Sequence, residues 1–282
     1  MSLLLGVNAF PASGDAARRQ QTALATWRGL SGVRLANLGW PGDVLEVDGF
    51  STHAVLRGDS RTASGRAGPR KPLVSEAFDR LAAIAAAEGC RWFAYANSDI
   101  VWTQEAVDAV ARGGREVYAL SRADVHPETG RVIEMVTAGI DAFVVSVGWW
   151  GANRRRFRAY IGGEPIWDNV YTAILLAHGD GLLLNREPLL RHERHPAGAW
   201  GSSPFAPYLG YLAALDSLYF TRWAVYHDRL LALRERGAGA EEETALQREV
   251  FRGPFPLPAR LKQVGRALRA RARWAAARRR RA

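Results

Sequence analysis

Cysteine is nearly absent from this sequence, which has Cys90 alone among 282 residues. A single cysteine excludes a disulfide within the chain and a zinc site built from a cysteine cluster. Cys90 directly precedes a predicted strand, where a buried core thiol is the expected state. The N-terminal stretch has no basic lead and no cleavage site, so we interpret it as a first strand. A reducing, cytoplasmic compartment is therefore expected.

Long apolar runs, lysine and, near the C-terminus, acidic residues are also scarce. No apolar run is long enough to span a bilayer. Lysine occurs only at Lys71 and Lys262, so arginine supplies nearly all of the positive charge. The net charge of +10 equals the ten basic residues from Arg260 onward, a stretch that contains no acid. The rest of the chain is neutral, and its ordinary apolar content predicts one substantial core.

The N-terminal part alternates predicted strands and helices. Residues 3–8 and 33–38 have the pattern of strands, and residues 16–30 that of a helix, which makes a βαβ unit. The first strand is not followed by G-x-G-x-x-G, so a dinucleotide-binding Rossmann domain is not expected. Residues 52–70 are polar and rich in glycine, serine and arginine, which predicts a mobile loop or lid.

The stretch 91–101 is the centre of the chain. Its apolar residues from Trp92 to Ala96 show no two-residue alternation, which favours a strand covered on both faces. Asn97 and Asp99 follow at the carboxyl end of this strand, the edge at which open α/β sheets bind ligands. A carboxylate and an amide oxygen can hold a hard divalent cation there. The alternative is that both residues only cap the next turn.

The following segment predicts a mixed sheet. Thr103 has the character of a helix N-cap before residues 104–112, and a strand is expected at 116–121. The sequence at 126–130 is typical of a hairpin turn, which requires antiparallel strands on either side. A further strand is expected at 139–146.

Three separated stretches together resemble the GT-A-type glycosyltransferase-like family. The resemblance covers about residues 1–200, and these stretches are Asn97-Ser98-Asp99-Ile100, Gly139-x-Asp141-x-Phe143, and Ile161-Gly162 with Trp167-Asp168-Asn169 before a helix. It implies a Rossmann-type three-layer α/β/α fold with a mixed, mostly parallel sheet and a helical C-terminal extension. It also implies transfer of a sugar from a nucleotide-diphosphate donor to a hydroxyl acceptor, assisted by Mn²⁺ or Mg²⁺. The first acid of the family's usual Asp-x-Asp motif is replaced here by Asn97.

The resemblance implies roles for particular residues. Asp99 and Asn97 would hold the metal, and His192 is the candidate third ligand, with ordinary loop histidine as the alternative for His192 and for His195. Asp168 matches the position of the catalytic base in inverting enzymes, although an aspartate there also serves as a helix cap. Asp141 would bind donor or acceptor, or act as the base.

Donor binding is assigned to Asn8, Phe10 and Lys71, together with Asn97 and Asp99. Phe10 would stack on the nucleotide base, with core packing as the more expected alternative. Lys71 would meet the donor phosphates, with a solvated surface position as its alternative.

The C-terminal part is expected to be appended to this domain. The expected boundaries are 1–203 for the nucleotide-sugar-binding domain, 204–258 for a helical extension and 259–282 for an arginine-rich tail. In that tail, Leu261, Val264, Leu268 and Ala275 fall on one side of a helix surrounded by arginines. Such a helix suits the anionic inner face of a membrane, where carbohydrate or lipid-linked acceptors are found, and a disordered terminus is the alternative.

Two other function classes stay open. A non-catalytic GT-A-like binding protein is compatible with Asn97 in place of an acid. A nucleic-acid-binding protein is compatible with the arginine tail but not with the neutral body of the chain.

Overall fold

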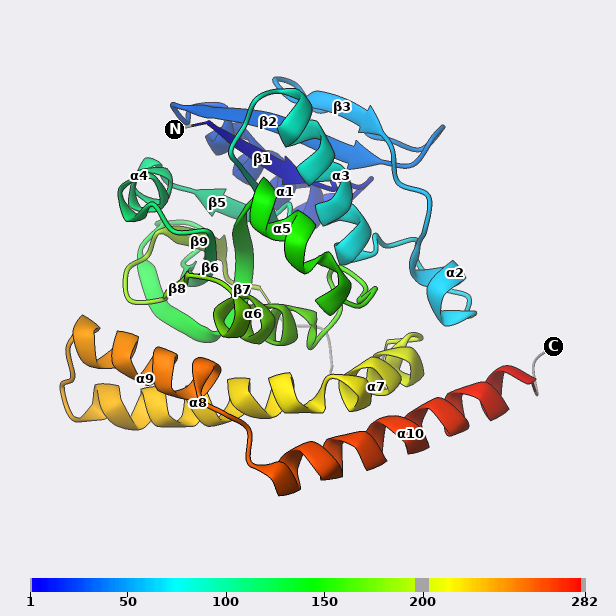
Figure 1. The fold of residues 1–282 in the computed structure, drawn as a ribbon. Coiled ribbons are helices and arrows are strands. Elements are labelled where there is room, and N and C mark those ends of the chain that lie inside the picture. The colour runs from blue at the N-terminus through cyan, green and yellow to red at the C-terminus, as the bar shows by residue number, and fades with distance from the viewer. Residues whose placement is uncertain (1, 196–202, 280–282) are drawn as a thin grey trace. The chain divides into compact units, whose positions relative to one another are not determined.

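The computed structural model describes residues 2–195 and 203–279 (Figure 1). Packing groups the chain into two compact units. The first comprises Met1–Arg57, Val74–Arg156 and Gly179–Ala197, and the second comprises Gly58–Leu73, Phe157–His178 and Gly198–Ala282. The domain boundaries expected at 203 and 258 rest on composition and stay predictions. Arg280 and Arg281 of the predicted tail lie outside the described residues.

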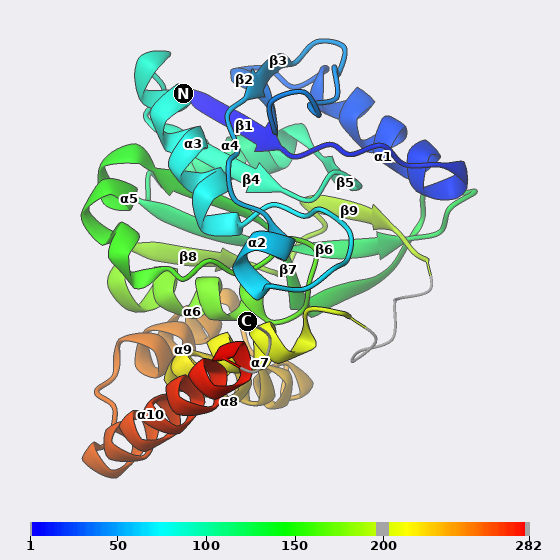
Figure 2. The same ribbon diagram turned by 90° about the vertical axis from the view of Figure 1, so that its right-hand side faces the viewer.

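The first unit is built on one mixed sheet (Figure 2). Its strands are β1 (Leu3–Val7), β2 (Val33–Gly39), β3 (Ser51–Ala54), β4 (Trp92–Ala96), β5 (Ile100–Trp102), β6 (Val117–Val125), β7 (Val132–Ser146), β8 (Gly181–Leu184) and β9 (Leu190–Glu193). The strand order is β3-β2-β1-β4-β7-β6-β9-β5, and β8 pairs with β6. Strands β1 to β4 run parallel, whereas β7 is antiparallel to its neighbours β4 and β6. The mixed, mostly parallel sheet expected from the sequence is confirmed.

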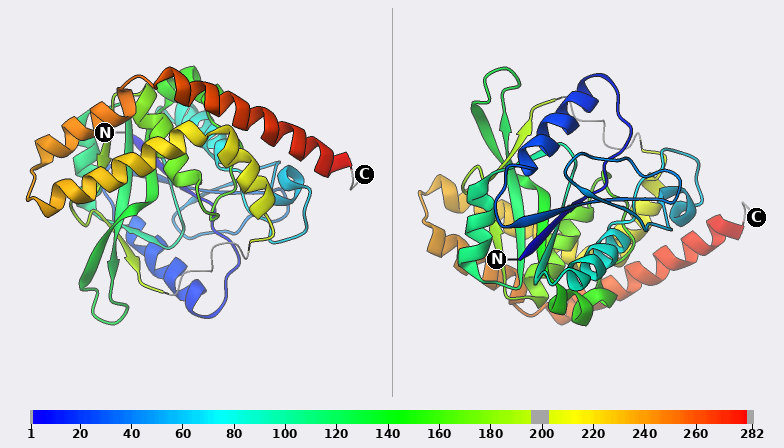
Figure 3. Two further views of the ribbon diagram at one scale, coloured as in Figure 1. Left: turned by 90° about the horizontal axis from the view of Figure 1, so that it is seen from below. Right: turned by 90° about the horizontal axis from the view of Figure 1, so that it is seen from above.

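Helices cover both faces of this sheet (Figure 3). Leu3 and Leu5 of β1 belong to a core that includes buried residues of α1 (Gly14–Trp27) and α4 (Gln104–Gly113). On the other face, Phe93 of β4 contacts Phe78 of α3 (Val74–Ala87) and Trp150 of α5 (Val147–Asn153). Successive strand residues point to opposite faces, so β4 needs apolar residues throughout. The three-layer α/β/α arrangement is confirmed.

The second unit is helical. It contains α2 (Ser60–Ser64), α6 (Trp167–His178), α7 (Ala206–Leu215), α8 (Ser217–Glu235), α9 (Ala240–Arg252) and α10 (Leu257–Arg279). Helices α8 and α9 lie side by side (Figure 1), and the guanidinium of Arg234 binds the carboxylate of Glu243 between them at 2.9 Å. The C-terminal helices expected from the sequence are present. Among the described residues, no helix combines the length and the apolar character required to cross a bilayer.

Several segments differ from the expectation in their extent. Residues 52–70, expected as one loop, contain most of β3 and all of α2. The carboxylate of Asp59 caps α2 by accepting a hydrogen bond from the amide of Thr62 at 2.8 Å, so polar residues in this segment satisfy its backbone locally. The strands expected at 116–121 and 139–146 are parts of the longer β6 and β7, which form the predicted hairpin.

Candidate functional site

Strand pairing brings three polar positions together at the carboxyl end of β4. Strand β9 lies between β6 and β5, so that His192 pairs with Asp124 of β6 on one side and with Ile100 of β5 on the other. Asp99 immediately precedes Ile100. Residues almost a hundred positions apart in the sequence therefore become neighbours at one edge of the sheet, which is the edge predicted for ligand binding.

Three potential metal-ligand atoms converge here. The Nε2 atom of His192 lies 3.5 Å from Oδ2 of Asp99 and 3.2 Å from Nε2 of His195, and the latter atom is 3.9 Å from the same Asp99 oxygen. A triangle with these sides has a point about 2.1 Å from all three atoms, which is an ordinary metal–ligand bond length. His192 is buried, whereas the side chains of Asp99 and His195 are about one-third exposed. A cation held by these residues would keep coordination positions open to a substrate.

The other ring nitrogen of His192 is occupied by a carboxylate. Its Nδ1 lies 3.1 Å from Oδ1 of Asp124, which favours the tautomer that donates from Nδ1 and leaves Nε2 as a ligand. Burial lowers the pKa of His192, but the interaction with Asp99 outweighs burial and the net shift is upward. Burial raises the pKa of Asp99, but the hydrogen bond with His192 and the charges of His192 and His195 together lower it by more, so the net shift is downward. Both shifts fit a site that a positive charge stabilises.

Arg122 connects this cluster to the predicted site residue Asp141. Its Nε donates to Oδ1 of Asp124 at 2.9 Å, and its Nη1 donates to Oδ2 of Asp141 at 2.8 Å. Burial lowers the pKa of Arg122, but these two carboxylates raise it more. Arg122 therefore stays charged and fixes both buried acids.

Asn97 is the last member of this network. Its side-chain Nδ2 donates to Oδ1 of Asp141 at 3.1 Å, and its backbone amide donates to the Asp141 carbonyl oxygen at 3.3 Å. Asp141 therefore accepts from Asn97 with one carboxylate oxygen and from Arg122 with the other. This gives Asp141 a clear positioning role, and its predicted contact with a substrate stays a prediction.

An irregularity in the β6–β7 ladder makes this network possible. Leu120 pairs with Ala142, but the next pairs are Ser121 with Ile140 and Arg122 with Val136. Such bulges re-aim side chains next to them. Gly139 lies in the bulge, where an added Cβ atom would be in ordinary contact, at 3.6 Å, with Nη1 of Arg122 and Oδ2 of Asp141 and closer, at 3.3 Å, to Cγ1 of Val136.

The neighbouring strand β1 leads into an open cavity. Asn8 follows β1 and donates to the carbonyl oxygen of Leu38 at 2.7 Å. The side chain of Gln20 holds the backbone of Phe10 by hydrogen bonds to its amide and its carbonyl oxygen. The Phe10 ring is 50% exposed and lines a cavity of 520 Å³ beside α1 and residues 45–48. Core packing, the more expected alternative for Phe10, is therefore wrong.

Two predicted site residues belong to the second unit. Lys71 binds the buried carboxylate of Glu164 at 2.6 Å and the carbonyl oxygen of Gly163 at 3.2 Å. Asp168 lies in the first turn of α6, two residues after Ile166, whose φ is 86°. A β-branched residue rarely adopts this left-handed conformation, and such strain concentrates at functional sites. The catalytic role of Asp168 stays a prediction.

Comparisons with known proteins give structural neighbours only. No family model and no curated protein matches the chain. Among solved structures, it is similar to S. aureus TarS 1–349 in complex with UDP-GlcNAc, with a TM-score of 0.49 and 12% identity over 97% of this chain and 80% of that chain. A second TarS 1–349 structure has a TM-score of 0.45 and 9% identity over 89% and 81% of the two chains. Similarity at this level says nothing of activity.

Sequence reasoning named Asp99 and His192 but missed their partners. His195 was expected to be an ordinary loop histidine, although it follows His192 by only three residues. Arg122 and Asp124 were not expected at the site at all. Their two-residue spacing on a predicted strand places them on one face, and that was the available signal.

Proposed function

We propose that this chain transfers a sugar from a nucleotide-diphosphate donor to a hydroxyl acceptor, with a divalent cation at Asp99, His192 and His195. The observation that carries the proposal is the convergence of Asp99 Oδ2 with the two Nε2 atoms at the carboxyl end of the sheet. Two imidazoles and one carboxylate favour Mn²⁺ over the harder Mg²⁺. Of the predicted ligands Asp99, Asn97 and His192, the proposal keeps Asp99 and His192. It replaces Asn97 with His195, because the Asn97 side chain is hydrogen-bonded to Asp141.

Each residue of the network has a distinct task in this proposal. Asp124 orients the ring of His192, and Arg122 fixes Asp124. Asn97 and Asp141 hold the end of β4, which directs Asp99 toward the histidines. A cation bound there would offset the charge that develops on the departing diphosphate.

The remaining tasks concern donor and acceptor. Phe10 would stack on the nucleotide base from its exposed position, with Asn8 fixing the backbone beside it. Lys71 would supply positive charge to the diphosphate, and Asp168 would accept the proton of the attacking hydroxyl. UDP-GlcNAc, the compound bound in the TarS complex, is a suitable first donor to test.

Calorimetric titration tests the proposal. Mn²⁺ is added to the protein, and UDP and UDP-GlcNAc are then added with and without the metal. We expect saturable Mn²⁺ binding that His195→Asn weakens at least tenfold, because one of three ligands is lost. His126→Asn, in the hairpin turn of the same unit, is the matched control and should bind as the parent does. Equal Mn²⁺ affinity in all three proteins would refute the metal site.

A product assay with donor and hydroxyl acceptors, run on the same protein, separates the non-catalytic alternative. Nucleotide-sugar binding without donor hydrolysis or transfer to any hydroxyl acceptor, in a protein that binds Mn²⁺ normally, would favour a binding protein over an enzyme.

A further inference from the structure

Helix α10 packs on the rest of the second unit through one narrow face. The side-chain amide of Gln263 donates to the carbonyl oxygen of Leu215, and its oxygen accepts a hydrogen bond from the Ser217 hydroxyl. Further along, Trp274 stacks on Tyr211 of α7, with ring centroids 5.1 Å apart and planes inclined by 7°. Gln263 and Trp274 lie on the same side because about eleven residues make three turns. Together they fix the rotation of α10.

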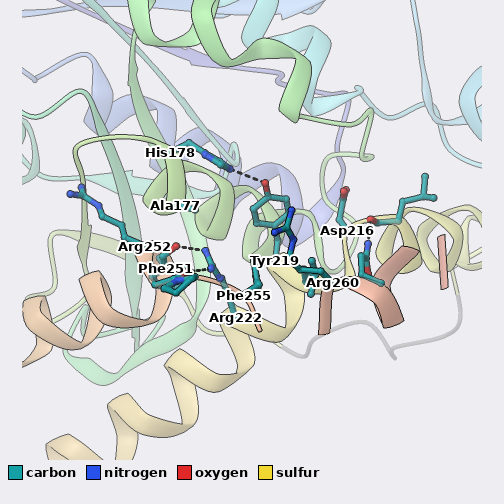
Figure 4. Close-up of a pocket in the computed structure, with 14 residues that line it drawn as sticks. Ala177, His178, Asp216, Tyr219, Arg222, Phe251, Arg252, Phe255 and Arg260 are labelled. Atoms are coloured by element: carbon teal, nitrogen blue, oxygen red, sulfur yellow. Dashed lines mark hydrogen bonds between the residues drawn. The ribbon is translucent and has the colours of Figure 1, made fainter. Parts of the chain in front are cut away.

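A corner between α9 and α10 fixes where α10 begins (Figure 4). The guanidinium of Arg222 donates to the carbonyl oxygens of Phe251 and Gly253 at the end of α9, and it lies 3.5 Å from the ring centroid of Phe255. These residues line a cavity of 430 Å³ that also reaches Arg260 in the first turns of α10. The position and the rotation of the helix in this unit are thus both determined.

A different face of α10 carries apolar side chains that the unit leaves exposed. Leu257, Leu261, Val264 and Leu268 are 65%, 63%, 55% and 59% exposed, and we call them the apolar stripe. Their spacing places all four on one side of the helix. At about 100° per residue, the stripe is turned roughly 120° away from the face that carries Gln263 and Trp274. Single exposed leucines need no explanation, but a continuous row marks an interaction surface.

Basic residues border the apolar stripe along one side. Arg260 and Arg271 lie along that edge, whereas Lys262 and Arg269 lie farther round the helix, about 110–130° from the centre of the stripe. The sequence from residue 257 onward contains ten basic residues and no acid. The helix is therefore apolar along the stripe, positive along one edge of it and basic on the flank beyond the other edge.

We propose that α10 lies on an anionic lipid surface, with the apolar stripe at the headgroup–acyl boundary and the bordering basic residues on lipid phosphates. A second copy of the chain fits poorly, because stripe-to-stripe contact would bring two positive, acid-free helices together. Nucleic acid would engage the arginines and leave the leucines without a partner. Lipid is the occupant that uses both features.

Vesicle flotation of the full chain, without metal or nucleotide, tests this inference independently of the proposed enzyme activity. The vesicles contain phosphatidylcholine alone or mixed with phosphatidylglycerol. Leu261→Ser with Leu268→Ser removes half of the apolar stripe and changes no charge. Val225→Ser with Leu231→Ser is the matched control, because these side chains are 44% and 42% exposed on α8. Arg260→Gln with Arg271→Gln tests the charge, and circular dichroism checks that each variant keeps its helices.

We expect the parent and the α8 control to bind the phosphatidylglycerol vesicles, and less so at high salt. The leucine pair should bind at least tenfold more weakly, since burial of one leucine side chain is worth about tenfold or more. The arginine pair should also bind at least tenfold more weakly, because each charge contributes about 1 kcal/mol. Unchanged vesicle binding by the leucine pair would overturn the inference, as would a parent that binds duplex DNA but no vesicle. A dimer that only the leucine pair abolishes, without vesicle binding by the parent, would overturn it in favour of a second copy.

Discussion

Asp124→Asn is the substitution that tests the network behind the proposed metal site. In the parent, Oδ1 of Asp124 faces both Nδ1 of His192 at 3.1 Å and Nε of Arg122 at 2.9 Å. Asparagine has nearly the same shape and keeps one oxygen as an acceptor, so the change removes the charge and little else. Carboxylates that bind the second nitrogen of a metal-ligating histidine raise its basicity and fix its ring.

Loss of such a carboxylate costs about 10- to 100-fold in metal affinity. We therefore expect Asp124→Asn to weaken Mn²⁺ binding by that factor in calorimetric titration. Arg122 retains its bond to Asp141, so the protein should still fold, with a loss of about 1–3 kcal/mol in the free energy of unfolding. Denaturant unfolding measures that loss separately from the metal affinity.

Asp180→Asn is the matched control. Asp180 also binds an arginine, Arg115, with Nη1 to Oδ1 at 2.7 Å, but its side chain is 51% exposed. Removing this surface pair should change the free energy of unfolding by less than about 1 kcal/mol and leave Mn²⁺ affinity unchanged. If Asp124→Asn folds and binds Mn²⁺ as tightly as the parent, Asp124 does not orient a metal ligand and the argument from the network fails.

Three further predictions concern single residues of the first unit. Asn97→Asp places a second carboxylate about 3 Å from Asp141, which should lower the free energy of unfolding at pH 7 by about 3 kcal/mol. In urea unfolding, this loss should shrink as the pH falls toward the ordinary aspartate pKa of about 3.9. An equally large loss at all pH values would contradict like-charge repulsion. Mn²⁺ affinity should rise as pH increases through the pKa of His192, because the protonated ring cannot bind metal. That pKa lies above its ordinary value of about 6.5. A calorimetric affinity that is flat from below to above that pKa would exclude His192 as a ligand. Phe10→Ala should leave the melting temperature unchanged, since Phe10 is half exposed. It should weaken nucleotide binding about tenfold through lost stacking. Unchanged nucleotide affinity would remove Phe10 from the donor site.

The elements that could be predicted from sequence are those that depend on local pattern. The buried strand β4 follows from an apolar run without alternation, and the hairpin follows from the turn residues at 126–130. The N-cap at Thr103 is confirmed by its hydroxyl, which accepts a hydrogen bond from the amide of Ala106 at 3.2 Å. Asp168 in the first turn of a helix was predicted in the same way.

The features that escaped prediction depend on pairing between distant strands. His192 and Asp99 meet because β9 inserts between β6 and β5, and no local pattern specifies that order. The register shift in β6 and β7 that brings Arg122 to Asp141 is equally non-local, since it reflects which side chains find partners across two strands. For Phe10, core packing was the more expected alternative to its predicted place in the donor site, but Gln20 holds its backbone at the rim of a cavity.

The replacement of an acid by Asn97 has a physical reason in this network. Asp141 accepts from Arg122 with one oxygen, so its other oxygen needs a donor, and the amide of Asn97 supplies one at 3.1 Å. An aspartate at 97 would oppose Asp141 instead. The two imidazoles of His192 and His195 provide ligand atoms that do not depend on the residue at 97. Asparagine at this position is therefore no argument against a metal-dependent enzyme. The metal affinity of the histidine variants tests the metal site, and turnover by the Mn²⁺-bound protein distinguishes an enzyme from a binding protein.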